Sequence, residues 1–191
     1  MCIRDSVAIS PPFGGSVQSL KAVLCGDHYI PNFHGEILDV LQQNTGIIAC
    51  LPNHYGFDPA DILWVIEDGS RKIRVRDYGS LAEEGYLPLQ IYRDLFVPHE
   101  GDIFHPCDLD THIVVAADNR TAVQYTSKTA FSYPRETEAV QGDGILSNRS
   151  LEMARTVFPA ARVTKVPNSS HSSLISNDRV IDIIRGYGGL C

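Results

Sequence analysis

An aspartate and a histidine near the end of the chain have residue types and spacing that suit an acid–base pair. Asp143 lies between two glycines directly after a predicted strand, and His171 follows in the polar segment Asn-Ser-Ser-His-Ser-Ser. Glycines allow a sharp turn that leaves a carboxylate facing a neighbouring loop. A carboxylate that orients an imidazole, which then activates a hydroxyl, is the arrangement of a Ser–His–Asp triad. The alternative is that Asp143 caps a helix and His171 is a surface histidine.

The chain contains no matching nucleophile motif. In α/β hydrolases the serine stands in a Gly-x-Ser-x-Gly turn, upstream of the acid and the histidine. Ser16 comes nearest, after two glycines, but Gln18 stands where the second glycine of the motif belongs. Ser10 precedes two prolines, which make a poor turn into a helix. Cys25 has no neighbour in the sequence that lowers the pKa of a thiol.

A second polar cluster offers metal-ligand residue types. The segment His-Pro-Cys-Asp-Leu-Asp-Thr-His contains His105, Cys107, Asp108, Asp110 and His112. Imidazole, thiolate and carboxylate groups are the usual zinc ligands. One interpretation is therefore a metal-dependent hydrolase built on His105, Asp108 and His112. The other is a loop of ordinary turn residues that leads into a strand.

The composition is that of a globular chain with a surplus of acidic residues. The 191 residues are 43% hydrophobic and 20% charged, with a formal net charge of −7. Nucleic-acid binding needs clustered Lys and Arg, so this charge disfavours it. The five cysteines are widely spaced and form no CxxC pair, which argues against a disulfide scaffold or a zinc knuckle. No apolar run reaches the roughly 18 residues of a transmembrane segment.

Strand and helix patterns alternate at both ends of the chain and must position the candidate residues. The apolar run 111–118 predicts a parallel strand that is buried on both faces. Further strands are predicted over 7–10 and 161–166, and helices over 17–26, 147–158 and 177–185. This organisation indicates an α/β fold with an inserted cap.

The middle of the chain has a mixed pattern. Asp68-Gly69 between two β-rich runs predicts a hairpin, and residues 120–135 predict another. A short amphipathic helix is predicted over 34–44, and residues 47–59 are expected to be irregular because they contain Pro, Asn and Gly.

Five segments, taken in order, resemble the lecithin:cholesterol acyltransferase-like family. They are VAISPPFGGSVQSLKAVLCGD, CLPNHYGFDPADILWV, RVRDYGSLAEEGY, GDGILSNRSLE and NSSHSSLISNDRVIDII. Together they extend over nearly all of residues 7–187. The acid turn reads Gly-Asp-Gly-Ile-Leu, where the family more often has Thr-Val after the second glycine.

The resemblance implies an α/β-hydrolase fold with a Ser–Asp–His triad that transfers or hydrolyses the acyl groups of lipid esters. Asp143 would be the triad acid and His171 the base, and the chemistry would need no cofactor or metal ion. The strand at 7–10 would follow the nucleophile's own strand and helix. The serine turn would therefore lie upstream of residue 7, and the chain would hold only the last three strands of the hydrolase sheet.

Residues 1–6, MCIRDS, resemble a translated sequencing adapter and are expected to be a non-native extension. The family resemblance divides the rest into 7–20, a strand and turn of the core, 21–106, a cap or lid, and 107–191, the C-terminal core. The cap would contact the lipid surface, and the chain alone is expected to be inactive and poorly soluble. A non-catalytic binding module of the α/β class is the alternative. The acyl donor, the acceptor and the compartment stay open.

Overall fold

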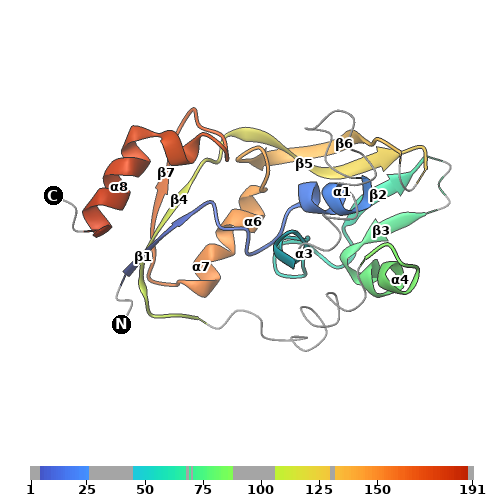
Figure 1. The fold of residues 1–191 in the computed structure, drawn as a ribbon, viewed down its shortest axis with the longest axis horizontal. Helices are drawn as coiled ribbons and strands as arrows, with labels where there is room; N and C mark the ends of the chain where they lie inside the picture. Colours follow the sequence, from blue (N-terminus) through green and yellow to red (C-terminus); the bar gives the residue numbers. More distant parts are fainter. Residues whose placement is uncertain are drawn as a thin grey trace.

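The strands form two sheets in the computed structural model, which describes residues 5–25, 45–67, 69, 71–87, 106–129 and 132–188 (Figure 1). The first sheet is parallel and has the order β1-β4-β7. Its strands are β1 (Asp5–Ile9), β4 (Asp110–Val115) and β7 (Arg162–Lys165). Parallel strands together with flanking helices confirm the predicted α/β class.

Strand β4 is the centre of the parallel sheet, and its two faces pack against different helices. Ile113 and Val115 pack against α6 (Asn148–Glu152) and α7 (Ala154–Val157), which contribute Leu151 and Ala154. Val114 faces the other way, into a cluster that includes Val180 of α8 (Asp178–Gly188). The prediction of a strand buried on both faces is therefore confirmed.

The second sheet is mixed and has the order β3-β2-β5-β6. Its strands are β2 (Ile62–Ile66), β3 (Lys72–Arg74), β5 (Asn119–Ser127) and β6 (Arg135–Gly142). Strands β2 and β3 are antiparallel, which confirms the first predicted hairpin. Strands β5 and β6 are antiparallel too, but the hairpin predicted within 120–135 is displaced, because its second strand begins only at Arg135. Gly69 has a φ of 71° in the first turn, and Asp68 lies outside the described residues.

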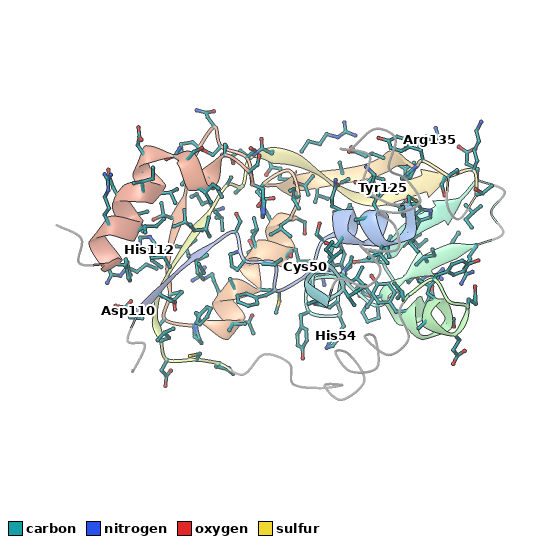
Figure 2. All side chains as sticks on the ribbon, in the orientation of Figure 1. Cys50, His54, Asp110, His112, Tyr125 and Arg135 are labelled. Atoms are coloured by element: carbon teal, nitrogen blue, oxygen red, sulfur yellow. The ribbon has the colours of Figure 1, made fainter. Side chains whose placement is uncertain are left out.

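The largest hydrophobic cluster packs three helices against the mixed sheet. These are α1 (Val17–Cys25), α3 (Thr45–Ala49) and α4 (Tyr78–Glu83), which follows the 3₁₀ turn η1 (Val75–Asp77). Trp64 is fully buried here, and its indole N–H donates to the Ser127 hydroxyl at 2.8 Å. Tyr125 of β5 donates to the Gln18 side chain of α1 at 2.9 Å and lies between these elements (Figure 2). The cluster thus draws on residues from both sides of the predicted boundaries at 20 and 106.

Two local predictions are correct in part. Residues 147–158 are helical almost throughout, but the helix is divided at Met153 into α6 and α7, and both pieces keep apolar residues on the sheet. Residues 50–59 are irregular as predicted, whereas residues 47–49 belong to helix α3, where Ile48 is buried in the large cluster. So short a helix has little stability of its own, and tertiary packing stabilises it. The helix predicted over 34–44 lies outside the described residues.

The segment between β1 and α1 joins the two sheets. A Cβ on Gly14 would lie 2.7 Å from the Ser150 Cα and 2.8 Å from the Gly56 Cα. The Ser150 hydroxyl donates to the Gly15 carbonyl at 2.7 Å. These glycines are therefore needed for close backbone packing. Among the helices that the structure describes, none is long and apolar enough to cross a membrane.

Candidate functional site

The fold brings Asp143 and His171 into direct contact. The Nδ1 atom of His171 lies 2.7 Å from the Oδ2 atom of Asp143. The His171 backbone N–H also donates to the Asp143 carbonyl, at 2.8 Å. Two bonds therefore join the histidine to the aspartate, one through the side chains and one through the backbone.

Asp143 lies in a tight turn after β6 and is completely buried. Its Oδ1 atom accepts the backbone N–H groups of Ile145 at 2.9 Å and Leu146 at 2.7 Å. A Cβ on Gly142 would meet the Leu146 carbonyl at 2.1 Å, and Gly144 has a φ of 100°. Both glycines are therefore required by the backbone of this turn.

Asp143 does not cap the helix that follows it. The N-cap residue of α6 is Ser147, whose hydroxyl accepts the Ser150 backbone N–H at 3.2 Å. The carboxylate instead uses one oxygen for the turn and the other for the imidazole. The helix-cap alternative for Asp143 is therefore wrong.

The hydrogen bonds to Asp143 keep it ionised in spite of its burial. Burial raises the pKa of this carboxyl group, but bonds from His171 and from the Leu146 and Ile145 N–H groups lower it, and the net pKa is below the usual value. A carboxylate only accepts hydrogen bonds, so the bonded Nδ1 atom of His171 carries a proton. In the neutral imidazole, the lone pair is then on Nε2.

The depressed pKa of Asp143 predicts how the free energy of unfolding depends on pH. A group with a lowered folded pKa contributes stability that is fully present above its unfolded pKa of about 3.9. That contribution is lost as the pH falls through the folded pKa. Urea unfolding at a series of pH values should show that the free energy of unfolding falls as the pH is lowered from neutral to acid. Asp143→Asn should reduce this fall. Asp182→Asn, at an exposed site, is the control and should keep the full fall; an unchanged fall in Asp143→Asn would contradict the prediction.

The remaining ring nitrogen of His171 is available for chemistry. The side chain is 34% exposed, and Nε2 makes no hydrogen bond with the described residues. A neutral imidazole with an orienting carboxylate on Nδ1 and an open Nε2 is arranged to take a proton from a bound group. The pair is therefore able to act as a general base.

None of the nucleophile candidates from the sequence, Ser10, Ser16 or Cys25, makes a hydrogen bond to His171 in the described structure. Ser16 caps α1 by accepting the Gln18 N–H at 3.1 Å, and it donates to the Ile145 carbonyl at 2.7 Å. Burial raises the pKa of the Cys25 thiol to about 12, which keeps it protonated. Both residues have structural roles.

Ser10 has features that the sequence did not indicate. It directly follows β1 with a φ of 40°, is 2% exposed, and its hydroxyl has no hydrogen-bond partner among the described residues. Its backbone N–H donates to the Val114 carbonyl. A serine with positive φ at a strand end is typical of a nucleophile turn, but here two prolines follow and the Ser10 hydroxyl makes no hydrogen bond to His171.

The polar cluster before β4 does not form a metal site within the described residues. His105 lies outside them, and the remaining members contain no group of three ligands close enough to bind an ion. His112 Nε2 bonds to the Thr164 hydroxyl at 2.8 Å, and its ring packs edge-on against Tyr187 (Figure 2). Asp110 pairs with Arg162, while Cys107 and Asp108 are exposed. Asp110 and His112 of this cluster therefore bond strand β4 to strand β7.

A cavity of about 590 Å³ adjoins the acid turn; we call it the side cavity. Phe57, Leu63 and Val123 form an apolar wall, and Ser147, which follows the turn, lines it as well. Its volume is in the range of small-molecule sites. Asp61 and Arg149 line it too, and these two side chains pair with each other at 3.5 Å.

Comparison with known proteins assigns no family. No protein-family model matches the chain, and no curated protein matches it.

Proposed function

We propose that Asp143 and His171 are the acid and base of a serine triad in a lipid O-acyltransferase or phospholipase-type hydrolase with an α/β-hydrolase fold. The observation that carries this proposal is the 2.7 Å contact between the buried Asp143 carboxylate and His171 Nδ1. The acid precedes the histidine along the chain, which is the order in α/β hydrolases. The resemblance to the lecithin:cholesterol acyltransferase-like family adds the lipid ester as the substrate class.

The chemistry would proceed in two half-reactions. His171 Nε2 takes the proton of the serine hydroxyl while the serine oxygen attacks the ester carbonyl carbon. The protonated histidine then gives this proton to the leaving alcohol, which leaves an acyl-serine. In the second half, His171 takes a proton from an acceptor alcohol or from water, whose oxygen attacks the acyl carbon. The bond between that carbon and the serine oxygen then breaks, the serine oxygen takes the proton back from His171, and the new ester or free acid is released. Asp143 holds the ring and balances its charge throughout.

The open edge of β1 supports a nucleophile on a neighbouring strand. Within the described residues β1 pairs with β4 alone, and no described strand bonds to the backbone N–H and C=O groups of its other edge. The three parallel strands β1, β4 and β7 correspond in number and direction to the end of a hydrolase sheet. We infer that the serine follows a parallel strand on this edge, since the carboxyl ends of parallel strands meet on one side.

The side cavity supports an ester with a hydrocarbon part. Its apolar wall suits an acyl chain or another apolar group. The Arg149 guanidinium already pairs with Asp61. Among the described residues that line it, the cavity therefore has no unpaired arginine that could bind an anionic head group. A binding module without catalysis would use the same cavity, and this is the second candidate.

Active-site labelling tests the proposed function. The coding sequence that precedes residue 7 is recovered from the source, and the longer chain is treated with a fluorophosphonate probe. We expect covalent labelling of one serine in a Gly-x-Ser-x-Gly turn, and hydrolysis of a soluble phospholipid. Residues 1–191 alone should show neither reaction, because His171 then has no hydroxyl to activate.

The His171→Ala variant of the longer chain is the control, and it should lose labelling. Labelling that persists in this variant, or ester hydrolysis by residues 1–191 alone, would exclude the triad. Lipid binding without labelling would favour the binding module.

A further inference from the structure

The first residues of β5 hold both halves of the acid–base pair. The Asn119 side-chain amide donates to the Ser169 carbonyl, two residues before His171, at 2.5 Å. The Thr121 hydroxyl accepts the backbone N–H of Gly144, directly after Asp143, at 2.9 Å. One end of one strand therefore contacts the turn of the acid and the loop of the histidine.

These contacts close a ring around the pair. Asn119 is paired with Gly142 across β5 and β6, and Gly142 is bonded covalently to Asp143. Asp143 binds the His171 ring, and the chain returns through two residues to Ser169, which accepts from Asn119. Because this ring is short, a change at Asn119 is expected to alter the distance between the Asp143 carboxylate and the His171 imidazole.

The histidine loop, residues 168–173, has few other long-range supports. The His171 N–H binds the Asp143 carbonyl, and the Asn177 amide donates to the Ser169 hydroxyl at 3.2 Å. The remaining hydrogen bonds of the loop are local, such as the bond from the Ser170 N–H to the Ser173 hydroxyl. Asn168 has a φ of 53°, in the left-handed region that costs energy for a residue with a side chain. The loop thus depends on external donors for its conformation.

We propose that Asn119 is a positioning residue for the base: its amide fixes the Ser169 carbonyl and so keeps His171 Nδ1 on Asp143. The effect of Asn119 on the reaction rate rests on the proposed function, but its effect on the contact between His171 Nδ1 and Asp143 does not. The Asn119 amide is the single donor to this carbonyl among the side-chain bonds of the described residues.

The first test is a nitrogen-edited NMR experiment on residues 1–191, kept in solution with a mild detergent because the chain alone is expected to be poorly soluble. A proton held between Nδ1 and a carboxylate resonates far downfield, and we expect this signal for His171 in the parent chain. Asn119→Asp has the same shape but presents a carboxylate to a carbonyl oxygen, so it repels the loop. We expect the signal to be lost, while the backbone amide spectrum of the mixed sheet persists.

Asn177→Asp is the matched control. It makes the same chemical change at the second contact to Ser169, but there the partner is a hydroxyl, which rotates and donates to the new carboxylate. The Nδ1 signal should survive in this variant. Asn119→Ala, which adds no charge, replaces Asn119→Asp if the latter fails to fold. Retention of the signal in a folded Asn119 variant would overturn the proposal.

The second test measures rates in the chain that carries the nucleophile. Asn119→Asp is expected to lower kcat about 100-fold, as a misplaced catalytic group does, with KM unchanged. A purely structural role would lower the fraction of folded enzyme but would leave kcat per folded molecule unchanged. If His171→Ala leaves the rate unchanged, the proposed function fails while the NMR result still decides the positioning. If His171→Ala abolishes the rate and Asn119→Asp leaves it intact, the positioning alone fails.

Discussion

Replacing Asp143 with asparagine is expected to lower kcat about 10⁴-fold in the chain that includes the nucleophile, with little change in KM. The carboxylate accepts from Nδ1 and leaves the lone pair on Nε2. An asparagine amide has almost the same shape, and its N–H donates to Nδ1, which then loses its proton. The proton moves to Nε2, so this atom no longer accepts the serine proton.

The rates would be measured on a soluble short-chain ester at neutral pH. Asp182→Asn serves as the control, because this aspartate is exposed on α8 and pairs with Arg185. It should leave kcat unchanged. A loss smaller than about tenfold in Asp143→Asn would show that Asp143 does not orient the base.

Replacing Gly15 with alanine is expected to destabilise the fold by roughly 2–5 kcal/mol, the sum of a left-handed backbone penalty and an overpacking penalty. Gly15 has a φ of 79°, and an added Cβ would lie 2.1 Å from the Leu51 carbonyl oxygen. That atom belongs to the backbone, so it has little freedom to move aside. The change also shifts the Gly15 carbonyl that accepts the Ser150 hydroxyl of α6.

Gly85→Ala is the matched control for this prediction. Gly85 has a φ of 82°, yet an added Cβ would meet nothing within 4 Å. It should therefore cost only the backbone penalty of about 1–2 kcal/mol. Urea unfolding of both variants measures the difference. Equal costs for the two substitutions would contradict the close packing between the Gly15 segment and Leu51.

The elements that could be predicted from the sequence are those whose signals are local. The Asp-Gly turn predicted the hairpin of β2 and β3, and the apolar run predicted β4 with both faces buried. Gly142 and Gly144 predicted the tight turn that presents Asp143. These features depend on residues that are neighbours along the chain, so the local sequence is enough to predict them.

The contacts between segments that are distant along the chain could be read only from the tertiary structure. The parallel pairing of β2 with β5, the break at Met153 and the buried hydroxyl of Ser10 have no signal in the sequence. The spacing of Asp143 and His171 suggested a pair, but their contact depends on the sheet order and on Asn119. Such contacts form between residues far apart in the chain, and their energies come from burial and hydrogen bonding that exist only after folding.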